Sequence, residues 1–264
     1  MLRLDEAIGR FVKSGDRVAL EGFTHLIPFA AGHEIIRQGI TDLTLIRMTP
    51  DLLYDQMIGA GCVKKLIFSW GGNPGVGSLP RFRDAVEHGW PRHLEVEEHS
   101  HAAMAHAYAA GAAGLPCAVF RGYLGSDLPH VNASIKSVTC PFTGEKLAAV
   151  PALRPDVTII HAQQADRDGN VLIDGIVGVQ KEAALAASKA IVTVEEIVDA
   201  FPPHGRGAVI LPSWTVAAVV LASGGARPSY AHGYYARDNA FYSDWEAIAK
   251  DRDTFRAWLQ EHVL

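Results

Sequence analysis

Residues 63–78, VKKLIFSWGGNPGVGS, combine an apolar run with a glycine-rich loop. The run at residues 66–68 is typical of a strand, and residues 79–90 after the loop are typical of a helix. Glycines let a backbone approach a ligand closely, and the N–H groups at a helix N-terminus favour an anion. The stretch therefore predicts a strand, a binding loop and a helix in succession, although an ordinary turn would give the same order of elements.

The two common nucleotide-binding fingerprints do not fit this loop. In the segment GVGSLP, Pro80 stands where the dinucleotide fingerprint GxGxxG has its third glycine. No GK[ST] follows, so the loop is not a P-loop either. The loop could hold a phosphate or a thioester, but by neither known arrangement.

Length and composition suit one large α/β domain over residues 1–264, since the chain is 48% hydrophobic and 20% charged. A formal net charge of -5 without a long basic run argues against nucleic-acid binding. No long apolar window without charge predicts a membrane span, and residues 1–12 lack a signal-type apolar core. Cys62, Cys117 and Cys140 are widely spaced and odd in number, which indicates reduced thiols in a cytoplasmic protein.

Apolar runs alternate with amphipathic stretches along most of the chain. The expected strands are residues 17–20, 43–47, 63–69, 94–98, 117–120, 157–161, 171–173, 190–194 and 209–211, with a hairpin at 136–139 and 147–150. The expected helices are residues 4–13, 29–38, 52–58, 81–88, 102–113, 180–188 and 216–220, with one or two more within 241–262. This order predicts an open, mostly parallel sheet with helices on both faces. We expect Gly22, Gly72, Gly75, Ser100 and Gly125 near one crevice at the carboxyl ends of its strands.

Two histidine motifs fail as metal sites. His99 and His101 flank Ser100 where a strand meets a helix, but no carboxylate or cysteine completes a recognisable ligand set. Ser100 instead has the residue type of a helix N-cap. The segment HEIIR begins like the zinc-protease motif HExxH, but Arg37 occupies the position of the second histidine. The sequence therefore predicts no metal.

Acidic residues near expected strand ends leave two interpretations open. Glu97 and Glu98 form one pair, Glu195 and Glu196 form another, and Glu21 stands alone before Gly22. Because side chains alternate along a strand, one carboxylate of each pair can point into the crevice, but solvent-exposed strand ends are at least as common. There is no GxSxG elbow and no clear cysteine nucleophile. Several binding loops without a complete catalytic set suggest that part of the active site lies on another chain.

Several long blocks resemble one enzyme family over almost the whole chain. The chain is similar to the A (alpha) chains of class I coenzyme A transferases in the blocks LEGFTHLIP, EIIRQGITDL, IGAGCVKK, RPDVTIIHAQQADRDGNV, IVTVEEIV and ARPSYAHGYYARDN. The nearest branches of the family act on glutaconate and on 3-oxoadipate. The blocks IRMTPDL, FSWGGNPGVGSL, SHAAMAHAY and SYAHGYY favour the 3-oxoadipate branch.

The resemblance implies a two-subunit enzyme with a shared active site. In the family an acyl-CoA is attacked by a glutamate of the B subunit, which becomes a glutamyl-CoA thioester, and an acceptor acid then takes the CoA. Coenzyme A is thus part of the substrate, and no separate cofactor is implied. Succinyl-CoA and 3-oxoadipate are the leading donor and acceptor, while glutaconate and other short dicarboxylic acids remain open.

The resemblance also assigns binding residues but no catalytic residue on this chain. By matching position, the first glycine loop of the family contributes Gly22, Phe23 and Thr24, the second Asn73, Gly75 and Val76, and the third segment Ser100. The chain departs from the glutaconate pattern at Gly71, Gly72, Gly77, Ser78 and His101.

Two alternatives to CoA transfer stay open. A hydrolytic relative of the family opens a steroid-derived ring with a glutamate on its A (alpha) chain, at the position of either Glu98 or His101 here. Hydrolysis of an acyl-CoA is therefore one alternative to transfer. A ligand-binding α/β module that has lost the chemistry is the other.

Overall fold

The computed structural model describes residues 2–123 and 125–264, and its centre is a nine-stranded sheet. The strands β4, β3, β2, β1, β8, β10 and β12 follow one another with parallel pairing at each step. β9 and β11 add an antiparallel extension beside β8. The bounds are β1 (Arg17–Glu21), β2 (Leu43–Arg47), β3 (Val63–Phe68), β4 (Glu95–Glu98), β8 (Val157–Asp166), β9 (Val171–Ile173), β10 (Lys189–Val198), β11 (Val209–Leu211) and β12 (Ala218–Leu221).

Helices cover both faces of this sheet, as the sequence predicts. One face packs against α1 (Leu4–Phe11), α2 (Phe29–Arg37), α3 (Leu52–Gly59), α4 (Pro80–Glu87), α8 (Asn239–Lys250) and α9 (Arg252–His262). The other packs against α5 (His101–Ala112) and α7 (Gln180–Ala186). Leu20 and Leu45 point to the first face, whereas Ala19 and Ile46 point to the second. Alternate side chains are thus buried on opposite sides, which explains why these strands read as continuous apolar runs.

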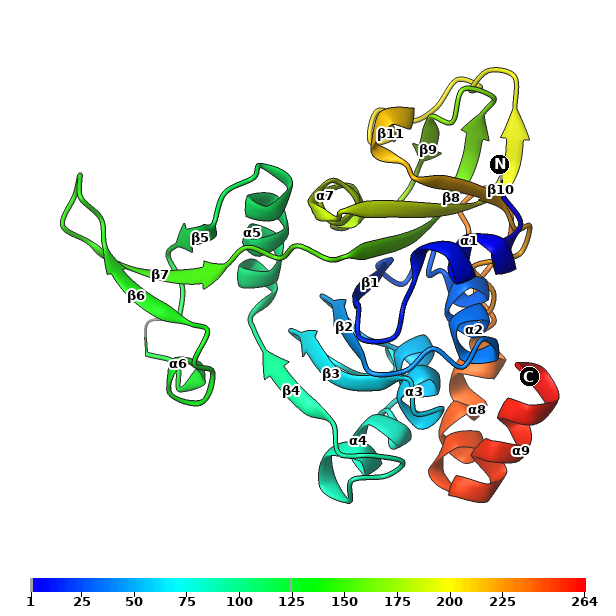
Figure 1. Cartoon of the computed structure of the whole chain (residues 1–264), viewed down its shortest axis with the longest axis horizontal. Helices are drawn as coiled ribbons and strands as arrows, with labels where there is room; N and C mark the ends of the chain where they lie inside the picture. The colour runs from blue at the N-terminus through cyan, green and yellow to red at the C-terminus, as the bar shows by residue number, and fades with distance from the viewer. Residues whose placement is uncertain (1, 124) are drawn as a thin grey trace.

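A small antiparallel sheet projects from the α5 side of the molecule (Figure 1). It consists of β5 (Cys117–Phe120), β7 (Lys146–Pro151) and β6 (Lys136–Thr139), and α6 (Leu128–Val131) lies between β5 and β6 in the chain. Phe120, Ala148 and Val150 bury one face of this sheet against α5. The predicted hairpin is confirmed, but β5 belongs to this sheet and not to the large one.

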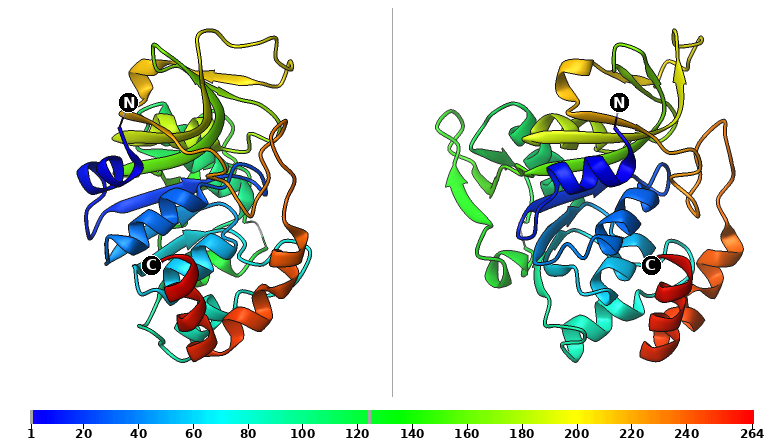
Figure 2. Two further views of the ribbon diagram at one scale, coloured as in Figure 1. Left: turned by 90° about the vertical axis from the view of Figure 1, so that its right-hand side faces the viewer. Right: turned by 45° about the vertical axis from the view of Figure 1, so that its right-hand side comes forward.

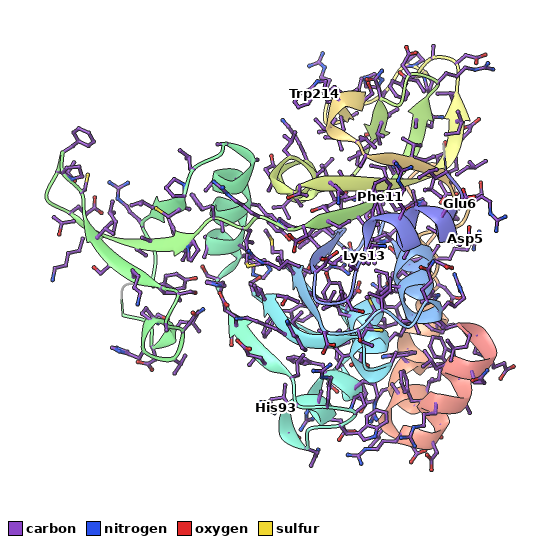
Figure 3. The ribbon with its side chains drawn as sticks, viewed as in Figure 1. Asp5, Glu6, Phe11, Lys13, His93 and Trp214 are labelled. Carbon is purple, nitrogen blue, oxygen red and sulfur yellow. The ribbon has the colours of Figure 1, made fainter. Side chains whose placement is uncertain are left out.

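The helix predicted at residues 216–220 is wrong. A single 3-10 turn (Ser213–Thr215) is followed by β12, which pairs with β10 so that Val220 lies opposite Thr193. Val219 and Val220 are β-branched and buried, so a place in the sheet favours a strand over a lone helical turn. Trp214 in the 3-10 turn is 81% exposed near β11, at the end of the molecule away from α8 and α9 (Figure 3).

Residues 222–238, which we term the crossing segment, connect the large sheet to α8. Figure 2 shows this segment in orange, running along one side of the molecule down to the C-terminal helices. Tyr230 O accepts a hydrogen bond from Leu26 N at 3.0 Å, and Ser229 Oγ donates to Thr24 O at 3.0 Å. Among the described residues, no helix has both the length and the apolar character to cross a membrane.

Candidate functional site

The loop after β1 is held in a conformation that demands a glycine. An ideal Cβ on Gly22 would lie 2.8 Å from the carbonyl oxygens of both His25 and Leu26, closer than real Cβ contacts. Thr24 and Leu26 have left-handed backbones, with φ of 56° and 53°. Such residues cost roughly 1–3 kcal/mol each and concentrate at functional sites. The loop that contains the predicted residues Gly22, Phe23 and Thr24 is therefore strained and close-packed.

A buried charged cluster lies beneath this loop. Glu21 Oε1 accepts hydrogen bonds from Met48 N at 3.1 Å and from the Tyr108 hydroxyl at 2.7 Å. Arg47 donates to Gly22 O at 2.7 Å and also makes a two-pronged ion pair with Asp51 at 3.0 and 3.2 Å. Burial raises the pKa of Glu21 to about 7, although the nearby Arg47 opposes this. The buried cluster therefore holds the loop after β1 in place through hydrogen bonds that are shielded from water.

The first half of the glycine loop after β3 is anchored by two hydrogen bonds. Gly72 N donates to Pro50 O at 3.2 Å, and the Asn73 side chain donates to Tyr242 O at 2.6 Å. Asn73 is buried, and its amide nitrogen ties the loop to α8, while its Oδ1 has no hydrogen-bond donor among the described residues. Gly75 is exposed with φ of +77°, and no atom lies within 4 Å of the position that a Cβ would take. The predicted residues Gly75 and Val76 therefore form the free tip of the loop.

Backbone N–H groups in both loops remain available to a ligand. Within residues 2–123 and 125–264, those of Phe23, Thr24, Gly71 and Gly75 have no hydrogen-bond acceptor. Phe23 and Val76 also expose 37% and 43% of their surface, so each loop presents an apolar side chain beside its free donors. The two loops thus combine free donors with apolar surface, which suits an acyl thioester or its oxyanion.

The segment after β4 contains the third predicted contact. His99 N donates to Phe68 O at 2.7 Å, which sets this segment beside the end of β3. The Ser100 hydroxyl accepts from Ala103 N at 3.2 Å, so the predicted N-cap of α5 is confirmed. Ser100 N donates to the Tyr123 hydroxyl at 3.0 Å. The N–H group of Ser100 is therefore engaged within the chain, whereas its hydroxyl, which accepts from Ala103 N, still has a proton to donate.

The other predicted residues lie in three places, namely the segment after β4, the loop after β5 and the end of the loop after β3. Glu98 and His101 are exposed on either side of His99 and Ser100. Gly125 is exposed in the loop after β5, whose Tyr123 touches Ser100, but that loop follows a strand of the small sheet. Ser78 lines a groove of about 680 Å³ with residues of α4, α8 and α9. Gly125 thus lies outside the row of loops at the carboxyl ends of β1 to β4, whereas Ser78 lies in the loop after β3, close to the start of α4.

One glutamate of each pair points inward, as expected from strand alternation. Glu97 lies 2.8 Å from Lys65 Nζ and 3.0 Å from the buried His99 ring, whereas Glu98 is exposed. The hydrogen bond from His99, with the Lys65 contact, lowers the pKa of Glu97 to about 2. Glu97 is therefore an ionised carboxylate whose oxygens are bound by Lys65 and His99.

The second inward glutamate, Glu195, belongs to a cluster that the sequence did not reveal. His161 Nε2 lies 2.7 Å from Glu195 Oε1, and Gly224 N donates to Glu195 Oε2 at 2.7 Å. The Tyr235 hydroxyl also donates to Glu195. Burial opposes ionisation, but these hydrogen bonds hold the pKa of Glu195 below its ordinary value. Glu195 therefore fastens the crossing segment to the sheet.

Sequence reasoning missed the residues that support the loops. β8 and β10 end at Asp166 and Val198, later than the sequence predicts. His161 and Glu195 therefore lie on parts of these strands that extend beyond the end of β1. Arg47 and Asp51 were also missed, although a charged residue that ends the apolar run LTLIR is a recognisable signal. Within the described residues, no group of three or more His, Cys, Asp or Glu side chains is arranged to hold a metal ion.

A family profile described as Coenzyme A transferase matches residues 1–222. Over 263 residues the chain is 66% identical to the A chain of 3-oxoadipate CoA-transferase of Pseudomonas knackmussii, and the match covers 100% of this chain and 93% of that protein. Over 283 residues it is 38% identical to the A chain of glutaconate CoA-transferase of Acidaminococcus fermentans, and this match covers 100% of this chain and 88% of that protein.

The fold is also similar to a solved structure. The crystal structure of glutaconate coenzyme A-transferase from Acidaminococcus fermentans superposes with a TM-score of 0.90 at 36% identity. The superposition covers 99% of this chain and 88% of that chain. The similarity therefore extends over the whole described fold, including the crossing segment and the C-terminal helices.

Proposed function

This chain belongs to the coenzyme A transferase family, and we propose that it is the A (alpha) component of a two-subunit enzyme that moves CoA from succinyl-CoA to 3-oxoadipate. The observation that carries the proposal is the full-length identity of 66% to the A chain of a 3-oxoadipate CoA-transferase. The glutaconate relative is 38% identical over a similar span, which favours 3-oxoadipate over glutaconate as the acceptor.

The chemistry that fits is covalent catalysis by a carboxylate of the B subunit. That carboxylate attacks the acyl carbon of succinyl-CoA, so a mixed anhydride forms and the CoA thiolate leaves. The thiolate then attacks the glutamyl carbon, which releases succinate and leaves a glutamyl-CoA thioester. 3-Oxoadipate repeats the two steps in reverse order, and the products are 3-oxoadipyl-CoA and the free glutamate.

The arrangement of carboxylates on this chain supports a nucleophile on the partner. Glu21 is buried and accepts two hydrogen bonds, and Glu97 is held by Lys65 and His99. Glu195 is occupied by His161 and the crossing segment. None of these three groups is free to attack a thioester without first losing its partners, and the exposed Glu98 is tested separately by substitution.

We assign to this chain the stabilisation of developing negative charge. Each attack on a carbonyl carbon creates an oxyanion, and preorganised backbone N–H groups stabilise such charge effectively where water is excluded. The free N–H groups of Phe23, Thr24, Gly71 and Gly75 are the donors that the chain offers. The apolar surface of Phe23 and Val76 would face the pantetheine arm of the CoA ester.

The expected location is the cytoplasm, where acyl-CoA substrates are used. Cys62, Cys117 and Cys140 are all free thiols, which suits a reducing compartment.

The function is tested by reconstitution. The purified chain alone should transfer no CoA, whereas the chain assembled with its B subunit should convert succinyl-CoA and 3-oxoadipate with ping-pong kinetics. Turnover by the lone chain would refute the shared site. Glutaconate in place of 3-oxoadipate should give a lower kcat/KM, and a preference for glutaconate would refute the proposed acceptor.

Hydrolysis is separated from transfer in the same assay. Glu98 and His101 are exposed beside Ser100, and one of the two stands at the position at which a hydrolytic relative has its glutamate. We expect Glu98→Ala and His101→Ala to leave transfer to 3-oxoadipate within about threefold of the parent, because neither residue is assigned to the oxyanion donors. A selective loss of thioester hydrolysis in either variant would instead favour the hydrolase alternative.

A further inference from the structure

A groove of about 440 Å³ lies on the side of the crossing segment that faces α2, α8 and α9. Its volume falls within the range of small-molecule sites. Its lining comes from residues far apart in the sequence: His33, Arg227, Pro228, Ala236, Asp238, Phe241, Ile248, Trp258 and His262. The groove is separate from the loops assigned to CoA transfer, since none of the residues 22–24 or 71–76 lines it.

The floor of the groove is apolar and aromatic. Phe241, Ile248 and Trp258 are half-buried and leave part of their surface open to the groove. The Trp258 ring is held edge-to-face against Trp245, with centroids 5.0 Å apart, and lies 6.0 Å from the Phe241 ring. A fixed aromatic wall of this kind favours a flat apolar group, because such a group buries its surface without reordering the wall.

The rim of the groove contains an uncompensated cation. The Arg227 guanidinium stacks on the Tyr235 ring at 4.3 Å, and in the described part of the chain it has neither an ion-pair partner nor a hydrogen-bond acceptor. A stacked guanidinium is oriented in advance for two-pronged binding of a carboxylate.

Of the other polar groups of the lining, Asp238 and His33 have partners within the chain, and the His262 ring lies 5.5 Å from the Trp258 ring. Asp238 is the acid of the lining, and its Oδ1 accepts a hydrogen bond from Phe241 N at 3.0 Å as the N-cap of α8. His33 Nε2 lies 2.8 Å from Gln56 Oε1, and burial lowers the His33 pKa, so the ring stays neutral. The cation at Arg227 and the aromatic floor together define the chemistry of the site.

We propose that this groove is a second small-molecule site, which binds a monocarboxylate with an aromatic body. The carboxylate pairs with Arg227, and the ring lies against Phe241 and Trp258. A short dicarboxylate of the kind used in CoA transfer does not match, because its second carboxylate would be placed on the apolar floor.

The probe for this site is benzoate, titrated calorimetrically into the chain assembled with its B subunit. We expect saturable binding with one site per chain, and no comparable binding of benzamide, which lacks the charge, or of adipate, which lacks the ring. Arg227→Gln should weaken benzoate binding at least about tenfold, because a charge-assisted pair is lost. Arg256→Gln is the matched control, since Arg256 also stacks on an aromatic ring but lies outside the groove.

Ile248→Asp provides a second variant that does not disturb the stacking of Arg227. A carboxylate at this half-buried position would repel benzoate, so binding should again be lost while the thermal midpoint is followed in parallel. The proposal is overturned by no saturable binding up to about 10 mM benzoate, by binding that Arg227→Gln leaves unchanged, or by equal binding of benzamide. Binding to the lone chain that disappears in the complex would also overturn it, because the partner would then occupy the groove.

Discussion

Glu21 is a fully buried carboxyl group at the point where β1 meets its loop. Because burial raises its pKa to about 7, it keeps its proton over a range in which an unfolded chain releases it. Well below pH 4.5, the group is largely protonated in both states, so it does not favour unfolding. As the pH rises from 4.5 towards 7, the unfolded state ionises first, and the free energy of unfolding falls.

The Glu21→Gln variant tests this linkage. An amide at this position can still accept from Met48 N and Tyr108, but it does not titrate. We expect the stability of the variant relative to the parent to increase between pH 4.5 and pH 7, by up to about 3 kcal/mol, as 1.4 kcal/mol per pKa unit implies. Denaturant unfolding of both proteins across this range provides the measurement, with the exposed Glu196→Gln as control. Parallel pH profiles of parent and variant would contradict the raised pKa.

The loop after β1 has no room for a side chain at Gly22. In Gly22→Ala the new Cβ would lie 2.8 Å from two carbonyl oxygens, so the backbone must move. We expect a loss of roughly 1–3 kcal/mol in unfolding free energy, and a fall in kcat/KM of the reconstituted enzyme. Gly207→Ala is the control, because no atom lies within 4 Å of its Cβ position. Equal effects of the two substitutions would show that the close approach at Gly22 is unimportant.

At the scale of elements, strand alternation was predictable but long-range pairing was not. β2, β5, β9 and β11 begin and end where the apolar patterns place them. The helix predicted at residues 216–220 is wrong because β12 is stabilised by pairing with β10, which lies more than twenty residues earlier in the chain. The β5 strand likewise joins the small sheet because of its pairing with β7, and nothing local in its sequence distinguishes the two sheets.

Substitutions in the loop after β3 can separate a loss of enzyme activity from a loss of protein stability. Gly75→Val should lower kcat/KM of the reconstituted enzyme by at least about tenfold, because a side chain would stand where a backbone N–H meets the thioester. Its positive φ adds strain of roughly 1–3 kcal/mol. Gly144→Val is a matched control, since Gly144 has φ of 72° and open space but lies in the turn of the small sheet.

Both activity and the thermal midpoint are needed to interpret these glycine variants. The two valine variants should lower the midpoint by similar amounts, while activity falls in Gly75→Val alone. If Gly144→Val lost as much activity as Gly75→Val, or if Gly75→Val kept full activity, the loop after β3 would be only a turn.

Across the molecule, the sequence predicts the loops but not what supports them. The placement of Gly22 and Gly75 at the carboxyl ends of β1 and β3 follows from the parallel order of the strands. Their support by Arg47 and by the crossing segment depends on contacts between residues 25 to 205 positions apart, such as Arg47 with Gly22 and Ser229 with Thr24. Such contacts leave no local pattern, so the sequence could not reveal which residues hold the two loops in place.

The site as a whole offers donors and apolar surface, whereas its inward carboxylates are occupied. The proposed mechanism accordingly places the covalent intermediate on the partner chain. Intact-mass measurement of both chains after the assembled enzyme is mixed with succinyl-CoA, without acceptor, tests this placement directly. We predict a CoA adduct, formed with release of succinate, on the partner chain and an unmodified mass for this chain. An adduct on this chain, or turnover in which neither chain is ever modified, would contradict the shared-site mechanism.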